Sequence, residues 1–541
     1  MFTKRKSCFT DFGYMVDCSR GAVPKVETLK KLINVLAEFG YNYLMLYTED
    51  IYEIDGEPYF GYMRGRYSKE EIKEIDSYCI SKGIELRACI QTLAHLGRIK
   101  RHSCYSSLFE IDDILLVKDD RVYELIDKMF AAVSKMFTSK NVHIGMDEAW
   151  ALGRGAFLDK HGNVSKKNIM SYHLKRVANL AKKYGFECDI WADMLYTAYY
   201  EAQDKDNFKI DIPDNITPIS WRYYRKSEEA SNEEFELYLK ISNGRFGFAG
   251  GAQKWSGIVP NNKYSFTALD EQIKSCRKYK IKRFLLTAWS DGAADASLFS
   301  TIPTLFYASL KAHGMDLNDR TRAYFKNTIG IKFKNFLFID LLNRIHPDTQ
   351  DGEANNLSFI FLFNDPLQGL FDEAVPNDCF SLYNNAAKDL YKNVNNENYG
   401  YIFKPLLSLA YTLKYKADLG VKIYSHYQNK DFKGLKNDLK QLAIARNNIT
   451  RFKNDYEIQW HIENKSFGYE KHNIRFGGLI ERLNYVEGQL QKYINGSIDR
   501  IDELEEKHLP ISEKWWNHNR PQDSSFHSYC QIVSSGMLKE I

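Results

Sequence analysis

The sequence lacks the features that identify several large classes of protein. Its nine cysteines are scattered from Cys8 to Cys530 without a CxxC pair or a cluster with histidines, which argues against a disulfide framework and a structural zinc site. No uninterrupted apolar run is long enough to span a membrane, and the first eight residues lack the apolar segment of a signal peptide. A net charge of +4, with both signs mixed along the chain, is no nucleic-acid signature. We therefore expect a reduced, cytoplasmic protein that binds neither membranes nor nucleic acids.

Motifs that hold common cofactors are also missing. The chain contains no HExxH motif, and no glycine-rich phosphate loop follows the first expected strand, where the residues run from Asp17 to Ala22. We therefore expect neither a metal ion nor an organic cofactor.

Eight short apolar segments in the first 290 residues predict β-strands, and amphipathic stretches follow most of them. Val26–Phe39 carries its leucines on one face, and Ser68–Ser81 begins with Ser68 and Glu71 spaced as in a capping box. Eight strand–helix units in about 315 residues predict a (β/α)8 barrel, while a doubly wound sheet is disfavoured by the missing phosphate loop. The strands are expected at 9–16, 42–47, 84–90, 141–146, 186–191, 216–221, 244–250 and 282–288.

The pattern changes beyond about residue 325, where apolar residues recur at helical spacing. We therefore predict two domains, a barrel over residues 1–325 and a mostly α-helical domain over residues 326–541. The second domain is expected to pack on the barrel or on a partner subunit, and a homodimer is one option. The repeating apolar residues are Leu435, Leu439 and Leu442, and then Leu479, Leu483, Val486 and Leu490.

The segment from His143 to Glu148 is the most informative part of the chain, because an apolar run ends there in two adjacent carboxylates. Carboxylates at the C-terminal end of a barrel strand are typical of a catalytic site, and paired acids cleave glycosidic bonds. Other acidic pairs, at 49–50, 112–113 and 270–271, are expected to be solvated. Adjacent strand residues point in opposite directions, so Asp147 and Glu148 reach one ligand only if the strand bends after Met146.

Tryptophans gather at the same expected edge of the barrel. Five of the eight lie at or shortly after the ends of strands: Trp150, Trp191, Trp221, Trp255 and Trp289. Aromatic walls with a few carboxylates are typical of a sugar subsite, because ring faces stack on the sugar and acids bind its hydroxyls. The sequence therefore predicts a carbohydrate-binding site at this rim.

The motif His-x-Gly-x-Asp-Glu at 143–148 resembles glycoside hydrolase family 20, the β-N-acetylhexosaminidases. The resemblance covers roughly residues 8–315 and includes the run from Asp17 to Arg20, His95, and Trp289-Ser-Asp291. It is nearest to the bacterial branch that lacks the N-terminal accessory domain and has a helical C-terminal one. It implies an exo-acting enzyme that removes terminal β-linked GlcNAc or GalNAc from oligosaccharides or glycoconjugates. The reaction would proceed with retention, and the substrate's 2-acetamido group would be the nucleophile.

The resemblance also implies roles for the catalytic residues. Glu148 would protonate the leaving oxygen and then deprotonate the incoming water, while Asp147 would accept the acetamido N–H and stay charged. His95 would help to hold Glu148, with either Glu49 or Asp50 behind it.

The remaining contacts that the resemblance implies are with the sugar. Tyr223 would bind the acetamido oxygen, and Trp191, Trp255 and Trp289 would surround the acetamido methyl group and the sugar face. Asp291 would bind the O4 and O6 hydroxyls.

Two positions depart from the family pattern, in which many members have glycine at the place of Met146 and an arginine that binds O3 and O4 at the place of Phe12. Arg20 is a candidate for the second role, although it also aligns with an arginine that is structural. Without the usual arginine to bind O3 and O4, the enzyme is expected to accept both gluco- and galacto-configured sugars, which differ at C4.

Two other functions remain open. One is another retaining barrel glycosidase, related to O-GlcNAc hydrolases or releasing a disaccharide. A carboxylate nucleophile there would have to lie about 5 Å from the acid, and Asp291 is the candidate. The other is a sugar-binding protein with a decayed site.

Overall fold

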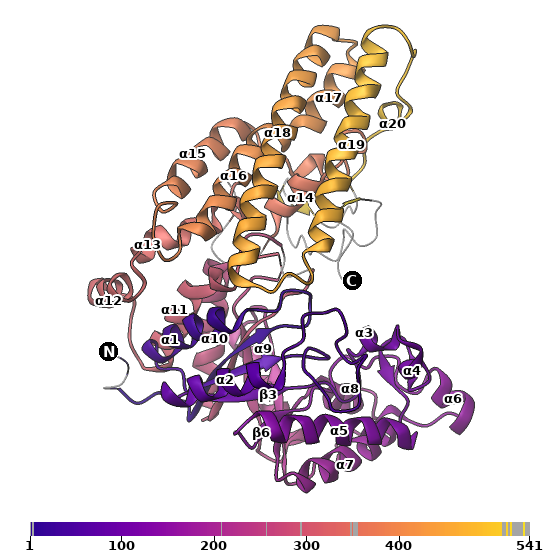
Figure 1. Cartoon of the computed structure of the whole chain (residues 1–541), viewed down its shortest axis with the longest axis vertical. Helices are drawn as coiled ribbons and strands as arrows, with labels where there is room; N and C mark the ends of the chain where they lie inside the picture. The colour runs from indigo at the N-terminus through magenta and orange to yellow at the C-terminus, as the bar shows by residue number, and fades with distance from the viewer. Residues whose placement is uncertain are drawn as a thin grey trace.

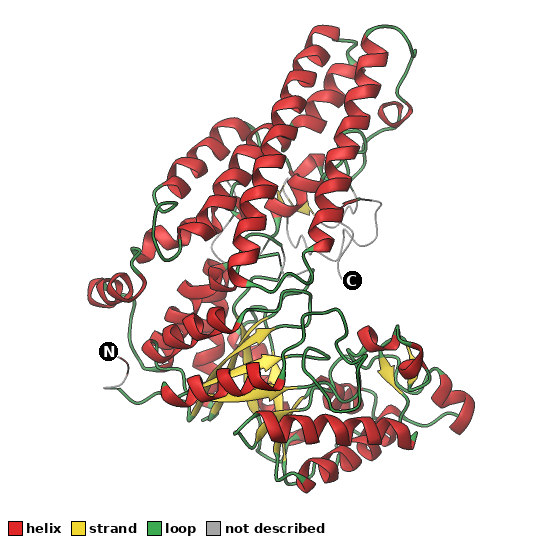
Figure 2. Cartoon of the chain, in the orientation of Figure 1, coloured by secondary structure: helices red, strands yellow, loops and turns green. Residues whose placement is uncertain are grey.

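A computed structural model gives the architecture of the chain. It describes residues 2, 5–206, 208–255, 257–292, 295–346, 349, 355–510, 516–517, 520–521 and 534–535. The first part forms a barrel, which occupies the lower half of Figure 1, and the second part forms a set of long helices above it. Figure 2 shows the strands gathered inside the lower half with helices around them.

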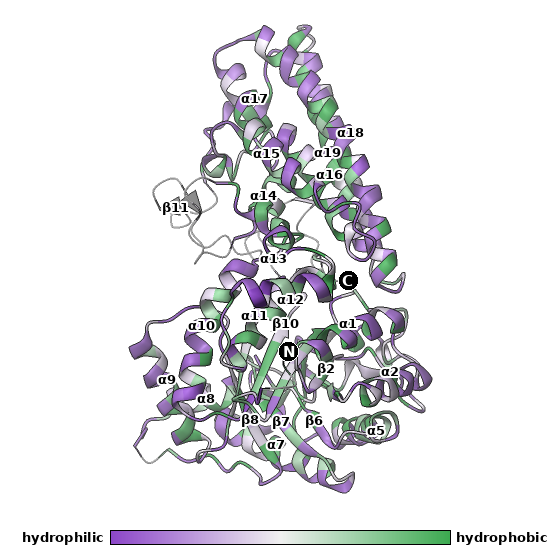
Figure 3. Cartoon of the chain, turned by 90° about the vertical axis from the view of Figure 1, so that its left-hand side faces the viewer, coloured by the Kyte–Doolittle hydropathy of each residue, from purple (hydrophilic) through white to green (hydrophobic). Residues whose placement is uncertain are grey.

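Eight parallel strands close the barrel in the order β1-β10-β9-β8-β7-β6-β3-β2. Figure 3 shows β10 in green at its centre, which agrees with the burial of five of the strand's six residues. All eight predicted strands are confirmed, and because the sheet is closed the doubly wound alternative is excluded. The strands are β1 (Asp11–Asp17), β2 (Tyr43–Tyr47), β3 (Glu85–Cys89), β6 (Asn141–His143), β7 (Glu187–Trp191), β8 (Ile216–Trp221), β9 (Gly247–Gly251) and β10 (Arg283–Ala288).

The barrel helices begin and end where local signals place them. In α2 (Lys69–Ser81), Ser68 Oγ accepts the Glu71 N–H at 3.2 Å while the Ser68 N–H donates to the Glu71 carboxylate at 2.9 Å, so the predicted capping box is confirmed. The other principal helices of the barrel are α1 (Val26–Glu38), α5 (Asp120–Met136), α7 (Lys166–Lys183), α8 (Asp193–Tyr200), α9 (Glu228–Ile241), α10 (Asn262–Lys278) and α11 (Ile302–Ala312).

Short elements surround the mouth of the barrel. Those between β3 and β6 form a broad loop region, at the lower right of Figure 1. They are α3 (Gly97–Lys100), α4 (Ser103–Ser106), β4 (Phe109–Ile111) and β5 (Ile114–Leu115); α6 (Ala156–His161) follows β6, and η2 (Leu298–Thr301) precedes α11.

The helical part is dominated by two long neighbouring helices, α18 (Phe432–Glu463) and α19 (Glu470–Ile494). Six of the seven apolar residues that predicted these helices are buried, because they form one face against the other helices. The remaining elements are α12 (Asp319–Ile329), α13 (Phe333–Phe336), η3 (Leu337–Asn343), α14 (Leu357–Phe363), η4 (Asp372–Ala374), α15 (Cys379–Tyr391), α16 (Gly400–Lys416), α17 (Leu419–Gln428), α20 (Asp502–Glu505), β11 (Trp516–Asn517) and β12 (Arg520–Pro521).

Three of the expectations concern the whole chain. The eight cysteines that the structure describes are free thiols, and Cys530 lies outside the described residues. None of the described helices is both long enough and apolar enough to cross a bilayer. The domain boundary at residue 325 falls within α12 and stays a prediction.

Candidate active site

A cavity of about 370 Å³ opens among the C-terminal ends of the barrel strands and contains all nine of the residues expected at the site. Its volume is in the range of small-molecule sites. The prediction that these residues lie together at one rim of the barrel is therefore confirmed, although their roles stay predictions. The lining residues are Arg20, His95, Asp147, Glu148, Trp191, Trp221, Tyr223, Tyr224, Trp255, Trp289, Asp291 and Gly292.

The chain bends sharply between the end of β6 and the acidic pair. Strand pairing stops at His143, and Gly145, Met146 and Glu148 have φ values of 72°, 71° and 53°. Gln91 holds this bend because its side-chain oxygen accepts the Met146 N–H at 3.1 Å. A Cβ at residue 145 would lie 2.0 Å from the same oxygen, so glycine is required there. The bend begins earlier than predicted, and it lets both acids line one cavity.

Asp147 is buried and surrounded by donors. Its Oδ1 accepts a hydrogen bond from Gln91 Nε2 at 2.7 Å, and its Oδ2 lies 3.3 Å from His95 Nε2. Burial alone raises the pKa of this carboxyl, but the His95 charge and these contacts outweigh burial and lower the pKa below its usual value. Asp147 is therefore ionised at neutral pH.

Glu148 differs from its neighbour in exposure and protonation. Its side chain is 44% exposed and lines the cavity, while its backbone N–H donates to Asp193 Oδ2 at 2.8 Å. Partial burial, and then the negative charge of Asp147, raise the pKa of the Glu148 carboxyl. The pKa values of the two adjacent acids are thus shifted in opposite directions, which suits Glu148 to donate a proton and Asp147 to remain charged.

His95 lies between the two acids. Its Nε2 is 3.3 Å from Asp147 and 3.6 Å from Glu148, and its backbone N–H donates to Asp113 Oδ2 at 3.0 Å. Burial, the largest single effect, acts to lower the His95 pKa, but the charge and hydrogen bond of Asp147 and the charge of Glu49 together raise it to about 10, so the ring is cationic. Ligand atoms of these three cavity residues lie within 4.8 Å of one another, close enough to hold a cation, and the expectation that no metal is needed stays a prediction.

The pair Glu49 and Asp50 is buried, so the expectation of a solvated pair is wrong there. Glu49 Oε1 accepts the Tyr47 hydroxyl at 3.1 Å and lies 3.5 Å from Arg20 Nη2, and burial raises the pKa of Glu49 to about 7. Asp50 instead accepts Arg64 Nε at 3.0 Å. The residues that follow them, Ile51 and Tyr52, are buried as well, so this whole turn after β2 lies inside the molecule.

The aromatic residues that line the cavity contact one another. Tyr223 stacks on Trp221 with ring centroids 5.3 Å apart and meets the edge of Trp255 at 5.3 Å, and its hydroxyl accepts Trp289 Nε1 at 2.8 Å. Trp191 is fully buried in the floor, and its indole N–H has no hydrogen-bond partner within the described part of the chain.

Arg20 and Asp291 face each other across one side of the cavity, with Arg20 Nε 3.9 Å from Asp291 Oδ1. Phe12 lies near the opposite end of β1, where it stacks on Tyr41 at 4.2 Å. The position of Phe12 therefore contributes nothing to the cavity, whereas Arg20 does.

Sequence reasoning missed two residues that hold the acidic pair, Gln91 and Asp193, and a third, Asp113, that holds the backbone of His95. Gln91 and Asp193 each lie two residues beyond the end of a barrel strand, so the rule that singled out the tryptophans could have found them. Asp193 also accepts Trp221 Nε1 at 3.4 Å, and burial and the Asp147 charge raise its pKa to about 7. Asp113 had no such signal, because it lies in the loop region between β3 and β6.

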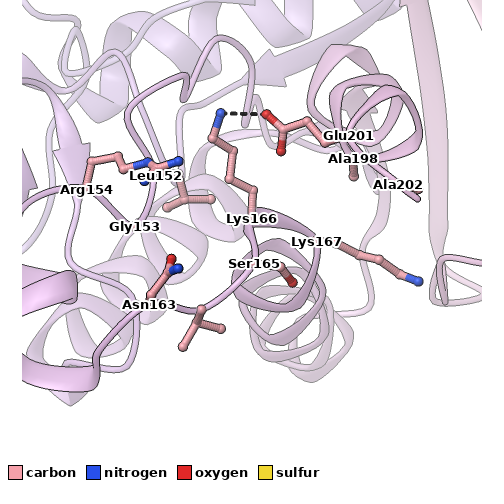
Figure 4. A pocket seen from close by; sticks show the side chains of 11 residues that line it. Leu152, Gly153, Arg154, Asn163, Ser165, Lys166, Lys167, Ala198, Glu201 and Ala202 are labelled. Carbon is pink, nitrogen blue, oxygen red and sulfur yellow. Dashed lines mark hydrogen bonds and ion pairs between the residues drawn. The ribbon is translucent and has the colours of Figure 1, made fainter. Parts of the chain in front are cut away.

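A second cavity, of about 210 Å³, lies outside the barrel mouth between residues 152–154, the start of α7 and α8. Figure 4 shows Arg154, Asn163 and Lys167 around it, and an ion pair of 2.9 Å between Lys166 and Glu201. Its lining has no aromatic wall and no pair of acids, so it lacks the features that predicted a sugar site at the first cavity.

Comparison with known proteins gives two family matches. Residues 10–283 match the glycosyl hydrolase family 20 catalytic domain, and residues 334–521 match the glycoside hydrolase 20C C-terminal domain.

Individual relatives are distant. Hexosaminidase D of Homo sapiens is 24% identical over 214 residues, which is 38% of this chain and 43% of that protein, so the match spans less than half of the human relative. Hexosaminidase D of Bos taurus is 21% identical over 346 residues, which is 60% of this chain and 96% of that protein. Among solved structures, a family 20 exo-β-N-acetylglucosaminidase from Vibrio harveyi, in complex with N-acetylglucosamine, is 18% identical. It covers 62% of this chain and 59% of its own, with a TM-score of 0.45.

Proposed function

Because this chain is a glycoside hydrolase that belongs to glycosyl hydrolase family 20, we propose that it is a retaining exo-β-N-acetylhexosaminidase that uses the acetamido group of its substrate as the nucleophile. The observation that carries the proposal is that the pKa of Asp147 is lowered while the pKa of Glu148 is raised. The two are adjacent carboxylates that line one cavity together with aromatic residues. A carbohydrate-binding protein with no catalytic role would not need a carboxyl group whose pKa is raised toward neutrality.

In the first step, the acetamido oxygen attacks the anomeric carbon while the bond to the leaving oxygen breaks. Glu148 donates its proton to the leaving oxygen, and the attack forms a bicyclic oxazolinium ion. Asp147 accepts the acetamido N–H and offsets the positive charge that develops on this group. Holding the nucleophile inside the substrate replaces a bimolecular attack, which can contribute about 7–11 kcal/mol.

In the second step, water attacks the same carbon and opens the oxazolinium ring. Glu148, now ionised, takes a proton from this water and is ready for another cycle. The product keeps the anomeric configuration of the substrate, because each of the two attacks inverts the anomeric carbon.

The aromatic residues would hold the acetamido group. The Tyr223 hydroxyl would donate to the acetamido oxygen, while Trp191, Trp255 and Trp289 would enclose its methyl group and the sugar face. Asp291 and Arg20 would bind the hydroxyls at the far end of the terminal sugar. The substrates would be terminal β-linked GlcNAc or GalNAc residues of glycans, and the name hexosaminidase that the human and bovine relatives carry supports this class.

We also propose that the enzyme acts in the cytoplasm, which the free thiols of the described cysteines support. The barrel and helical domains would meet near residue 325.

Two measurements test the proposed mechanism. In ¹H NMR of the hydrolysis of p-nitrophenyl β-GlcNAc, the β-hemiacetal should appear first. A thiazoline in which sulfur replaces the oxazolinium ring oxygen should inhibit competitively. An α-product would exclude retention, and indifference to the thiazoline would favour a carboxylate nucleophile such as Asp291. Binding of GlcNAc without any hydrolysis would favour a decayed sugar-binding site.

A further inference from the structure

Two buried cations of the C-terminal domain point toward the barrel from the start of α19. Lys471 and Arg475 lie four residues apart, on one face of the helix, and each side chain is about 1% exposed. Lysine and arginine are almost never fully buried unless their charges are paired. The partners of Lys471 and Arg475 belong to the barrel, so they indicate the role of this end of α19.

Arg475 binds the segment that follows β10. Its Nη2 donates to the backbone oxygen of Gly292 at 2.9 Å, and its Nη1 donates to Asp295 Oδ1 at 2.8 Å. Tyr456, on α18, donates its hydroxyl to the backbone oxygen of Asp295 at 2.8 Å. Gly292 lines the cavity and directly follows Asp291, so the two-pronged contact of Arg475 sets the path of the chain next to that carboxylate.

Lys471 binds the segment that follows β1. Its Nζ donates to the backbone oxygen of Arg20 at 2.6 Å. Nearby, a Cβ at Gly468 would lie 2.2 Å from the backbone oxygen of Gly21, so two backbones touch at this point. The Lys465 N–H also donates to the backbone oxygen of Val23 at 2.8 Å. In Figure 1, the connection between α18 and α19 lies against the dark loops of the barrel.

The two barrel segments held in this way carry the two residues that face each other across the cavity, Arg20 and Asp291. We propose that Lys471 and Arg475 are positioning residues that fix Arg20 and Asp291 for recognition of the hydroxyls of the terminal sugar. The C-terminal domain is then a structural part of the sugar site. This inference rests on the proposed function, because it assigns the hydroxyl end of that site.

Positioning matters here because binding of the sugar hydroxyls tolerates only a small displacement of the side chains that bind them. The Arg20 and Asp291 side chains project from loops, and loops hold a site less accurately than strands do. An arginine that binds a backbone oxygen and a carboxylate together fixes direction as well as distance. Misplacement of a binding group by about 1 Å can cost about 100-fold in rate.

The test uses Arg475→Lys, which keeps the charge but has no planar fork to bind Gly292 and Asp295 together. The matched control is Arg482→Lys, on the same helix, where Arg482 Nε binds Asp365 at 2.7 Å within the C-terminal domain. Steady-state rates are measured for 4-methylumbelliferyl β-GlcNAc and β-GalNAc, which differ at O4. Hydrogen exchange is followed in the segments after β1 and β10.

For Arg475→Lys, we expect KM to rise by about 5- to 50-fold with a smaller change in kcat, and the GlcNAc/GalNAc preference to shift. Exchange in both loop segments should increase. Arg482→Lys should change neither KM nor the preference, even where it lowers the melting temperature. A folded Arg475→Lys variant with wild-type KM, epimer preference and exchange would overturn the proposal.

Failure of the proposed function would look different. A wild-type enzyme inactive on both conjugates would refute the hexosaminidase activity, and the exchange comparison would still decide whether Arg475 fixes these loops. Should Arg475→Lys fail to fold, Lys471→Met provides the same comparison through the Arg20 loop. Unchanged exchange and KM in that variant would count against the proposal.

Discussion

Replacing Asp193 with alanine is expected to slow the cleavage of natural glycosides by about 10- to 150-fold. The Asp193 carboxylate accepts the backbone N–H of Glu148 at 2.8 Å and Trp221 Nε1 at 3.4 Å. It thus fixes a residue whose φ of 53° few side chains adopt without support. Alanine removes both bonds, so Glu148 loses the contact that aims its carboxyl at the leaving oxygen.

The magnitude follows from the main hydrogen bond. At a pH above 7, where the Asp193 carboxyl is ionised, a bond to this charged acceptor contributes about 1.5–3 kcal/mol. About 1.36 kcal/mol corresponds to a tenfold change in rate, so losing this whole contribution in the transition state gives the range of about 10- to 150-fold. Asp193→Asn keeps an oxygen that can accept the Glu148 N–H, so we expect it to lose less than about fivefold.

The assay compares chitobiose with 2,4-dinitrophenyl β-GlcNAc, whose leaving group needs no protonation. A displaced general acid slows the first substrate much more than the second. Equal losses on both would mean that Asp193 supports the fold or substrate binding instead. Wild-type rates on chitobiose for Asp193→Ala would refute the positioning role altogether.

Four further predictions concern the acidic pair and His95 beside it. Glu148→Gln should remove most activity on chitobiose and less on the dinitrophenyl glycoside, and full activity on chitobiose would contradict the general-acid role. Asp147→Asn should lower kcat/KM by about 100-fold or more while circular dichroism stays native, because the neutral amide no longer offsets charge on the acetamido group; a wild-type rate would remove that role. The pH profile of kcat/KM should fall on the basic side at a pH above the ordinary Glu value of about 4.3, since Glu148 must be protonated and its pKa is raised. In His95→Gln the acidic limb should move to higher pH, because the cation that lowers the Asp147 pKa is gone; an unmoved limb would refute that assignment.

The regular part of this fold could be predicted because periodicity and capping are local. Ser68 and Glu71 cap α2 as expected, and the eight strands appear in the expected places. The clustering of the site residues follows from one rule, since the C-terminal ends of all barrel strands meet at one rim.

Other features depend on contacts between residues far apart in sequence. The bend before Asp147 is set by Gln91, 55 residues before the Met146 N–H that it binds. The burial of Glu49 depends on how the turn after β2 packs, which its neighbours in sequence do not determine. The contact from Arg475 to Asp295 spans 180 residues and joins the two domains. Local sequence patterns do not predict contacts of this kind, because they form between residues that only the folded chain brings together.

The most direct test of the account compares release of 4-methylumbelliferone from its β-GlcNAc conjugate with release from the β-glucoside. These substrates differ in the 2-acetamido group, which is the proposed nucleophile. The account predicts cleavage of the first and a rate on the second lower by several orders of magnitude, because the glucoside has no group for Asp147 to orient. Comparable rates on both conjugates would contradict substrate assistance and indicate a carboxylate nucleophile in this cavity.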